Sequence, residues 1–358
     1  MDTSNIISLF SESYSESRIK FLNAAKSKNL DVQSHILNIM GAQGEVLAID
    51  VVLDGPKNAS KILVIISGVH GVEGFCGSAI QTGLLLSSIP KPSNTSILYI
   101  HAVNPHGFSY LRRVTQENVD PNRNFNNFNL NLPFNEGYSQ IHDALLPIEW
   151  PPKAENEDIL NQYVKLHGAK EFQKAVSLGQ YHHPEGMWFG GTSPTWSNKV
   201  VREILKEHLT KVKVLASIDI HTGLGPYGVG EKIFASFDND MFEEAQNWWG
   251  EITNVFTGSS TSVPTAGPIQ VALTEESSSA KHIGICLEYG TYSLEEVLTA
   301  LRADHWAYRY GKYDTLQGKK ITTQLKNIFF PNKSDWKISV WKQAYKAVLQ
   351  AMEGIKNY

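Results

Sequence analysis

ILVIISGVHGVEG, residues 62–74, is the stretch that determines the fold expected for this chain. Residues 62–66 form a continuous apolar, mostly β-branched run, which is typical of a strand covered on both faces. A glycine-bounded turn follows and contains His70-Gly-Val-Glu73. In open α/β sheets, ligands gather at the carboxyl ends of the strands. The stretch therefore predicts a buried strand with two potential metal ligands at its carboxyl end.

Similar apolar runs recur along the chain and alternate with helical patterns. This alternation predicts an α/β protein, specifically a three-layer α/β/α sandwich with a central mixed, largely parallel sheet. The other expected strands are residues 46–52, 97–103, 212–220, 233–237 and 283–287. The expected helices are residues 15–28, 75–86, 156–178, 198–209, 242–249, 294–310 and 336–352.

The overall composition narrows the class of protein. Of 358 residues, 42% are hydrophobic and 19% are charged, and the formal net charge is −4. These values are ordinary for a soluble globular protein and lack the basic footprint of nucleic-acid binding. A chain of this length fits one elaborated α/β domain. We therefore expect a single catalytic domain over residues 1–358, with a small molecule or peptide as substrate.

The sequence shows no sign of export or membrane insertion. Its N-terminal region lacks the basic and apolar parts of a secretory signal, and no run of eighteen apolar residues occurs. Cys76 and Cys286 stand apart rather than in a paired framework. We expect a cytoplasmic protein with reduced cysteines and no membrane partner. The sequence leaves the oligomeric state open.

Residues 126–197 depart from the strand and helix pattern. They begin with the Asn-rich NNFNLNLPFNEGY and contain GQYHHPEGMWFGGTSP near their end. A long connection of this composition either closes over a site as a lid or packs as an appendage beside the sheet. We predict an insertion within the catalytic domain, and the sequence leaves both roles open.

Two further strands also end in side chains that can bind metal or move protons. The run at residues 212–220 leads into Asp219-Ile-His221, and the run at residues 283–287 is followed by Glu288. Two histidines and a carboxylate form a common catalytic zinc site, which leaves one position open for water. His70, Glu73 and His221 are thus candidate ligands, and Glu288 is a candidate general base.

A polar stretch between these motifs concentrates arginine in an acidic protein. Asn104 to Gly107 follows a strand, and NPHGFSYLRRVTQENVDPNRNF contains Arg112, Arg113, Asn122 and Arg123. Guanidinium groups bind carboxylates bidentately and can stabilise a developing oxyanion. The stretch therefore indicates a substrate with a carboxylate.

Together these motifs resemble the zinc carboxypeptidase superfamily, which includes metallocarboxypeptidases and the aspartoacylase and succinylglutamate desuccinylase deacylases. The resemblance rests on HGVE, VDPNRNF at residues 119–125, DIHT at residues 219–222 and LEYG at residues 287–290. They occur in the family's order and cover roughly residues 62–292. We expect the fold of that superfamily and a place in a bacterial branch of it.

The resemblance implies a metal site and its catalytic base. His70, Glu73 and His221 would bind one zinc ion, and Glu288 would act as general base and then as general acid. Asp120 matches the carboxylate that orients the first ligand histidine. Such a partner selects the tautomer of the histidine and raises its basicity.

The resemblance also implies how substrate is held. Asn122 and Arg123 match the pair that binds a substrate carboxylate. Arg113 best matches the arginine that polarises the scissile carbonyl. Arg112 is the competing assignment and otherwise a further substrate-binding residue, because the spacing before VDPNRNF varies among relatives.

The chain departs from digestive carboxypeptidases in one motif. Those enzymes place a tyrosine on a loop about twenty residues before the catalytic glutamate, and residues 263–280 contain no tyrosine. Tyr289, Tyr292, Tyr181 or Trp188 could take its place, and no spacing selects among them.

Three other polar residues admit two readings each. Asp219 either orients His221 or is an ordinary solvated strand end. His182 and His183 are adjacent, so in an extended segment their side chains diverge, which favours a loop or lid role over metal binding.

Other hydrolase and cofactor classes lack their motifs. No G-x-S-x-G or phosphate-binding loop follows a strand, and GLGPYG at residues 223–228 suits a turn better than a dinucleotide-binding helix. We predict a zinc-dependent metallopeptidase of carboxypeptidase type, which cleaves an amide bond next to a free carboxylate. The alternatives are an N-acyl-amino-acid deacylase of the aspartoacylase type and a non-catalytic carboxylate-binding module.

Overall fold

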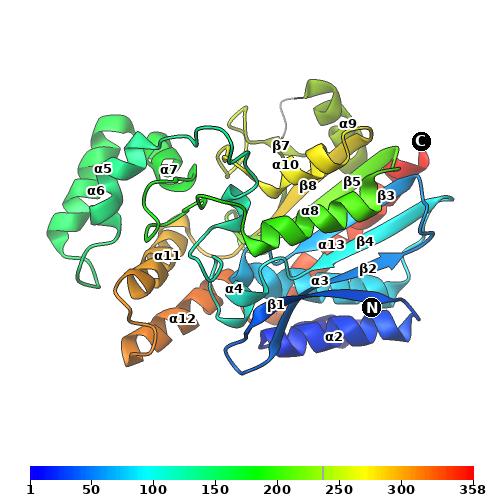
Figure 1. Ribbon diagram of the computed structural model, residues 1–358, viewed down its shortest axis with the longest axis horizontal. Coiled ribbons are helices and arrows are strands. Elements are labelled where there is room, and N and C mark those ends of the chain that lie inside the picture. Colours follow the sequence, from blue (N-terminus) through cyan, green and yellow to red (C-terminus); the bar gives the residue numbers. More distant parts are fainter. Residues whose placement is uncertain (236–237) are drawn as a thin grey trace.

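A mixed sheet runs through the molecule, as the computed structural model shows for residues 1–235 and 238–358 (Figure 1). Its strand order is β1-β2-β4-β3-β5-β8-β6-β7. The four strands β4, β3, β5 and β8 are parallel to one another, whereas β2 and β6 join this group antiparallel. The strands are β1 (Val32–Met40), β2 (Val46–Asp54), β3 (Lys61–Ser67), β4 (Thr95–His101), β5 (Val214–Gly223), β6 (Gly230–Phe234), β7 (Thr253–Asn254) and β8 (Lys281–Gly290).

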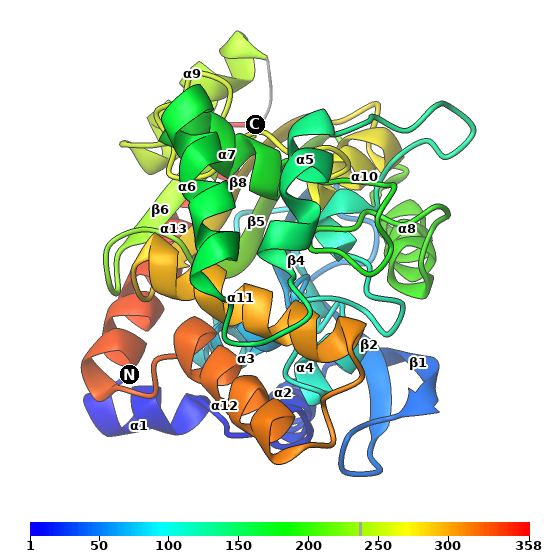
Figure 2. The same ribbon diagram turned by 90° about the vertical axis from the view of Figure 1, so that its left-hand side faces the viewer.

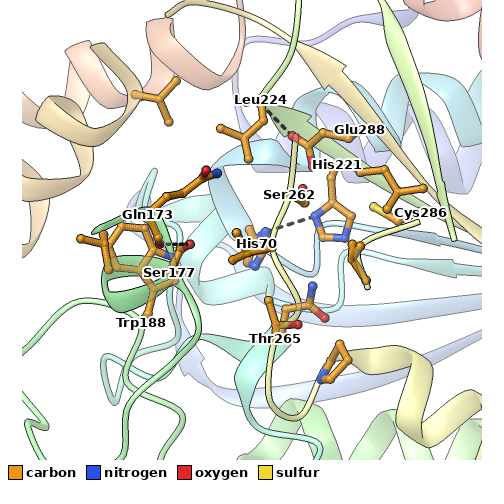
Figure 3. A pocket seen from close by; sticks show the side chains of 18 of the residues that line it. His70, Gln173, Ser177, Trp188, His221, Leu224, Ser262, Thr265, Cys286 and Glu288 are labelled. Atoms are coloured by element: carbon orange, nitrogen blue, oxygen red, sulfur yellow. Dashed lines mark hydrogen bonds between the residues drawn. The ribbon is translucent and has the colours of Figure 1, made fainter. Parts of the chain in front are cut away.

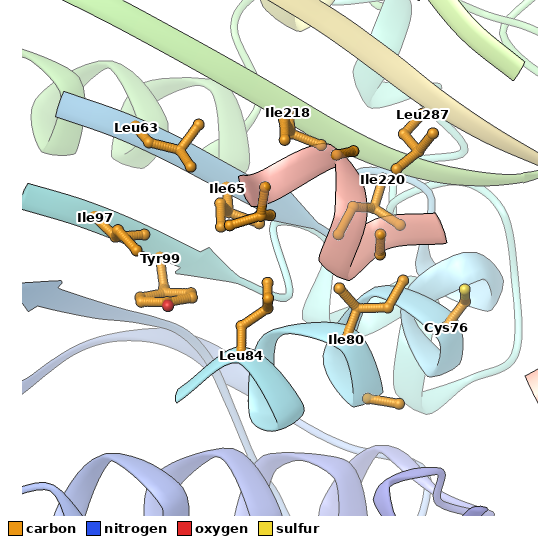
Figure 4. Packing of buried hydrophobic residues seen from close by; sticks show 14 of the residues in the cluster. Leu63, Ile65, Cys76, Ile80, Leu84, Ile97, Tyr99, Ile218, Ile220 and Leu287 are labelled. Carbon is orange, nitrogen blue, oxygen red and sulfur yellow. The ribbon is translucent and has the colours of Figure 1, made fainter. Parts of the chain in front are cut away.

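Helices cover both faces of this sheet, which confirms the predicted α/β/α layers. On one face, Leu63 and Ile65 of β3 pack with α2 (Tyr14–Ser27), α3 (Gly74–Ser87) and α13 (Ser334–Lys356) (Figure 4). On the other face, Val64 and Ile66 pack with α8 (Trp196–Leu209) and α10 (Ile269–Glu276). Each fully buried side chain of this size contributes about 1.5–3 kcal/mol to stability. Two-sided burial explains why β3 reads as a continuous apolar run.

A third group of helices packs beside the sheet. It consists of α5 (Glu136–Leu145), α6 (Ala154–His167) and α7 (Ala169–Ser177) together with α11 (Leu294–Arg309) and α12 (Leu316–Phe329) (Figure 2). Val72, from the turn after β3, belongs to the same apolar cluster. The cluster thus adjoins the carboxyl end of β3, and it includes most of the helical part of residues 126–197. Whether that segment acts as an insertion or a lid stays a prediction.

The boundaries of most expected elements shift by a few residues, and one expected helix is wrong. Residues 156–178 form two helices rather than one, because Gly168 adopts φ 89° between α6 and α7. Glycine adopts positive φ at little cost, and here it ends the first helix. The expected strand at 233–237 appears as β6, which ends at Phe234, and residues 236–237 lie outside the described part.

Several elements were not expected at all. The edge strand β1 is exposed along most of its length, so its sequence carries no apolar periodicity. The helices α1 (Thr3–Leu9), α4 (Pro105–Ser109), α5, α10 and α12 were also missed. The expected helix α9 (Asn239–Trp249) begins three residues before its expected start. None of the described helices is long and apolar enough to cross a lipid bilayer.

Candidate metal centre

The turn after β3 holds His70 and Glu73 in a tightly packed position. A short 3-10 helix, Gly71–Glu73, follows His70 and continues directly into α3. A Cβ on Gly71 would lie 2.0 Å from the backbone carbon of Gly107, so no larger residue fits there. The backbone amides of Gly71 and Val72 also donate to the carbonyls of Arg113 and Arg112. This close backbone packing fixes the direction of both potential ligands.

His70, Glu73 and His221 converge on one point, as the sequence predicted. Figure 3 shows the two histidines next to each other. One ligand atom from each lies within 4.8 Å of the others, and all three residues are buried. The Nδ1 atoms of His70 and His221 are 3.1 Å apart. Glu73 brings Oε1 to 2.9 Å from Nδ1 of His70 and Oε2 to 3.0 Å from Nδ1 of His221.

The outer nitrogens of the two histidines face carboxylates. Nε2 of His70 lies 3.2 Å from Oδ1 of Asp120, and Nε2 of His221 lies 2.7 Å from Oδ2 of Asp219. If Nε2 of His221 carries its proton and donates it to Asp219, the Nδ1 lone pair points toward Glu73. Nε2 of His70 also lies 2.8 Å from Nη2 of Arg113, which can only donate, so these contacts do not fix the tautomer of His70. The lone pair of His221 and the carboxylate of Glu73 face each other, which favours a positive charge between them. The donor set therefore fits a divalent metal ion with zinc's preference for imidazole and carboxylate.

Glu288 lies beside the ligand cluster on the neighbouring strand. His221 and Glu288 are partners in the parallel register of β5 and β8, so both reach the same edge of the sheet. The backbone N–H of Leu224 donates to Oε1 of Glu288 at 3.0 Å (Figure 3). Burial, followed by the negative charge of Glu73, raises the pKa of Glu288 to about 7. A carboxyl group with a pKa near neutrality can both accept and donate a proton.

The other acidic groups of the site are stabilised in the ionised form. Burial opposes ionisation of Glu73, but His70 and His221 hold its pKa well below the usual range. Burial likewise opposes ionisation of Asp120, whose pKa is held low by Arg113 and His70. The carboxylates around the histidines therefore stay ionised, whereas Glu288 in the same pocket can take up a proton near neutral pH.

Arg113 lies directly against the ligand cluster. Its Nη1 donates to Oε1 of Glu73 at 3.0 Å, and its Nε donates to Oδ2 of Asp120 at 3.0 Å. The side chain lines the pocket together with Glu288. This position suits the predicted role of polarising a carbonyl, which stays a prediction.

Arg112, the competing assignment and a predicted substrate-binding residue, lies elsewhere. Its Nη2 is 3.1 Å from Oδ2 of Asp304 in a buried ion pair, and the rings of Tyr308 and Tyr313 lie against its guanidinium. Arg112 is not among the described residues that line the pocket. The structure therefore gives this arginine a role in the fold, because its charge is already compensated in the core.

We expect Asp304→Asn to lower the free energy of unfolding by about 3–5 kcal/mol, because it leaves the buried Arg112 charge without its partner. Urea unfolding measures this loss. Asp143→Asn is the matched control, since Asp143 is 88% exposed in its ion pair with Arg309. The control should change stability by less than about 1 kcal/mol. Equal losses in the two variants would show that the buried Asp304 pair stabilises the fold no more than an exposed ion pair does.

Asn122 and Arg123 both line the pocket, and their polar atoms differ in availability. Oδ1 of Asn122 accepts from the backbone N–H of Ile269, which orients the side chain. The Arg123 guanidinium donates to the carbonyl oxygens of Ser177 and Asn122. Burial lowers the pKa of Arg123, and no described carboxylate forms an ion pair with it. Arg123 is thus a buried cation without a direct ion pair in the described chain, and the charge of Asp120 acts on it only from beyond contact distance.

Of the aromatic residues that could replace the missing tyrosine, Trp188 is the one that lies in the described pocket wall. Trp188 lines the pocket, in a left-handed backbone conformation with φ 50°. Tyr181 instead uses its hydroxyl to bond the carbonyls of Arg123 and Ala266, and the described pocket wall includes neither Tyr289 nor Tyr292.

Several site features were missed or left open at the level of sequence. Asp219 proves to be the partner of His221, and their spacing of two residues on one strand is the signal that could have decided it. The backbone N–H of Thr222, which donates to Glu73 at 3.1 Å, has no sequence signal. His182 and His183 are not among the described lining residues.

The chain was compared with protein families, with curated proteins and with solved structures. Residues 10–343 match the model of a family described as "Protein of unknown function (DUF2817)". No curated protein matches the sequence. Among solved structures, it is similar to carboxypeptidase A from Helicoverpa armigera, with 15% identity, a TM-score of 0.46 and coverage of 88% of this chain and 73% of that one.

Two other solved structures are similar at comparable distance. Thrombin activatable fibrinolysis inhibitor shares 12% identity, with a TM-score of 0.47, over 97% of this chain and 78% of that one. Succinylglutamate desuccinylase from Chromobacterium violaceum shares 13% identity, with a TM-score of 0.38, over 87% of this chain and 73% of that one.

Proposed function

Because the chain belongs to the DUF2817 family, whose description names no activity, we propose a function from the site itself. The protein is a zinc-dependent hydrolase of carboxypeptidase type, which cleaves an amide bond next to a free carboxylate. The observation that carries this proposal is the convergence of His70, Glu73 and His221 beside Glu288. Their burial in one pocket with Arg123 adds a place for the carboxylate.

The ligand set suits a catalytic rather than a purely structural ion. Three protein ligands leave a coordination position for water or substrate. A zinc ion held there supplies Lewis acidity, which polarises a carbonyl and lowers the pKa of a coordinated water. Asp219 holds His221 in the tautomer that such binding needs, and Asp120 lies within hydrogen-bond distance of Nε2 of His70.

The remaining steps belong to the side chains of this chain. Glu288 accepts a proton from the attacking water and returns it to the leaving amine. The guanidinium of Arg113 is the donor next to the ligand cluster, so it stabilises the negative charge that develops on the carbonyl oxygen. Arg123 and Asn122 hold the substrate carboxylate, which brings the neighbouring amide bond to Glu288.

The direct test is hydrolysis by the purified, zinc-loaded protein. We expect release of the C-terminal residue from short N-acylated peptides, or of the amino acid from N-acyl amino acids, with the rate lost after chelation and restored by zinc. A metal-loaded protein that binds these carboxylates without cleaving any of them would favour the non-catalytic binding module.

The role of Arg123 makes a separate prediction. Arg123→Lys keeps a positive charge but loses the planar fork, so kcat/KM for substrates with a free carboxylate should fall by roughly 10–100-fold. The corresponding carboxamide substrates, which cannot form the ion pair, should be cleaved poorly by both proteins. Steady-state kinetics on the matched pairs measures the effect.

Arg202→Lys is the control, because Arg202 pairs with Glu275 and Glu276 away from the ligand cluster. It should leave kcat/KM unchanged. If Arg123→Lys lowered the rates on carboxylate and carboxamide substrates by the same factor, Arg123 would not recognise the carboxylate.

A further inference from the structure

The charges in the pocket wall are few, and each belongs to a group with an assigned role. The pocket has a volume of about 280 Å³. Among the described residues that line it, the arginines and carboxylates are Glu73, Glu288, Arg113 and Arg123. His70 and His221 are the histidines of the wall, and it contains no described lysine or aspartate. The rest of the described wall is uncharged.

Of the two arginines, only Arg123 forms no ion pair with a carboxylate of the described chain. Arg113 is held between Glu73 and Asp120 at 3.0 Å from each. Arg123 donates instead to carbonyl oxygens, which are neutral, and forms no ion pair with a described carboxylate. A guanidinium carries five N–H donors, so Arg123 retains donors for a carboxylate beyond those three bonds. The pocket can therefore compensate one negative charge on a ligand.

One side of the pocket is mainly apolar, and uncharged polar side chains such as Gln173 and Gln270 also line the pocket. On one side, Phe172 and Val176 of α7 lie with Trp188, which Figure 3 shows close to Ser177. Val297 and Leu301 of α11 belong to the same apolar cluster as Val176 and Trp188 and also line the pocket. These side chains form an apolar surface that favours hydrocarbon and disfavours charge.

The backbone of Trp188 supports a binding role for this wall. A left-handed conformation is uncommon for a bulky residue and costs about 1–3 kcal/mol, so surrounding contacts must hold it. The bridge between Gln180 and Phe189 and the bond from Gln180 N–H to the Trp188 carbonyl provide those contacts. The indole is thus placed in the wall at a cost in backbone energy, as is typical of functional sites.

Lys170 and Lys174 are the cations next to wall residues of α7, and neither adds a counter-charge inside the pocket. Both are exposed; the ammonium group of Lys170 lies near Gly258, and that of Lys174 pairs with Glu171. A solvated ammonium at the rim is screened by water, so it compensates a carboxylate inside the pocket only weakly.

We propose that the substrate carries a single carboxylate, next to the scissile amide, and that its acyl group and side chain are uncharged and apolar. Acyl groups or side chains with a second carboxylate, such as succinyl or aspartyl groups, are excluded because no second cation is free to receive them. This inference rests on the proposed hydrolysis and names the substrate class of that site.

Isosteric substrates test the inference on the wild-type zinc enzyme. N-(4-methylpentanoyl)-leucine can be compared with N-succinyl-leucine, which replaces the terminal isopropyl group by a carboxylate, and with N-(4-methylpentanoyl)-aspartate. We expect kcat/KM to be at least about 100-fold lower for either dicarboxylate, because an unpaired buried carboxylate is strongly disfavoured. Comparable or higher rates on a dicarboxylate would overturn the inference and leave the proposed hydrolysis intact.

A binding measurement separates the inference from the proposed function. Titration calorimetry with the zinc-loaded Glu288→Gln variant should show binding of N-(4-methylpentanoyl)-leucine and at least about 100-fold weaker binding of N-succinyl-leucine. Selective binding together with no hydrolysis by the wild-type protein would refute the proposed function and keep the ligand class. Equal binding of both compounds, or binding of neither, would refute the ligand class.

An engineered charge gives a further test. Leu298 lines the pocket on α11 and is half-buried, whereas the adjacent Thr299 is exposed and outside the described wall. Leu298→Arg should raise the ratio of kcat/KM for N-succinyl-leucine to that for N-(4-methylpentanoyl)-leucine by about 10-fold or more. Thr299→Arg adds the same charge to the same helix and should leave the ratio unchanged. An equal shift in both variants would show a long-range charge effect and contradict the proposed wall.

Discussion

Replacing Glu288 with glutamine should lower kcat by roughly 10²–10⁴-fold while the purified variant keeps its zinc. The amide of glutamine preserves the size of the side chain and can still bond the Leu224 N–H through its carbonyl oxygen. It cannot accept a proton from water. The near-neutral pKa of Glu288, which burial and Glu73 raise to about 7, is suited to that transfer. Steady-state assays measure kcat, and metal analysis of the same sample measures the bound zinc.

Glu231→Gln is the matched control for Glu288→Gln. Glu231 lies on β6 opposite Glu288 in the strand register, and its carboxylate bonds the hydroxyls of Thr253 and Thr261 instead of lining the pocket. The control should retain its turnover. A Glu288→Gln enzyme with near-wild-type kcat would remove Glu288 from the proton transfer.

Replacing His221 with alanine should reduce bound zinc from about one ion per chain to below about 0.1, because it removes one of three protein ligands. Turnover should fall with the metal. Excess zinc should restore neither to the wild-type level, since the remaining pair, His70 and Glu73, offers an incomplete site. Atomic absorption on protein purified and dialysed under the same conditions measures the metal.

His282→Ala is the control for this prediction. His282 is a half-buried histidine of β8, where its Nε2 lies 2.8 Å from the Ser217 hydroxyl and burial lowers its pKa to about 4. Its loss should affect stability more than metal content. Full zinc occupancy in His221→Ala, or equal metal loss in both variants, would contradict the ligand set.

The parts of the fold that could be predicted from sequence include the strands that are covered on both faces of the sheet. β3 is covered on both faces, so its apolar run is continuous and its end at the HGVE turn is visible. β1 is an exposed edge, and its sequence therefore resembles a polar loop. The split between α6 and α7 depends on one glycine with positive φ, which helical periodicity does not register.

In the site, too, residues in local motifs could be predicted from sequence, whereas contacts between distant segments could not. His70 and Glu73 follow a recognisable strand, and His221 and Glu288 lie near the carboxyl ends of two others, so their meeting at one sheet edge could be expected. The choice between Arg112 and Arg113 could not, because it depends on Asp304, far along the chain. The apolar wall between α7 and α11 likewise arises only from packing of distant segments.

The most direct test of the central claim is anomalous diffraction at the zinc edge from crystals of the active, zinc-loaded enzyme. The account predicts one strong peak per chain, bounded by Nδ1 of His70, the carboxylate of Glu73 and Nδ1 of His221, with Glu288 beside it. An active enzyme with no peak there, or with its only peak at other residues, would contradict the account.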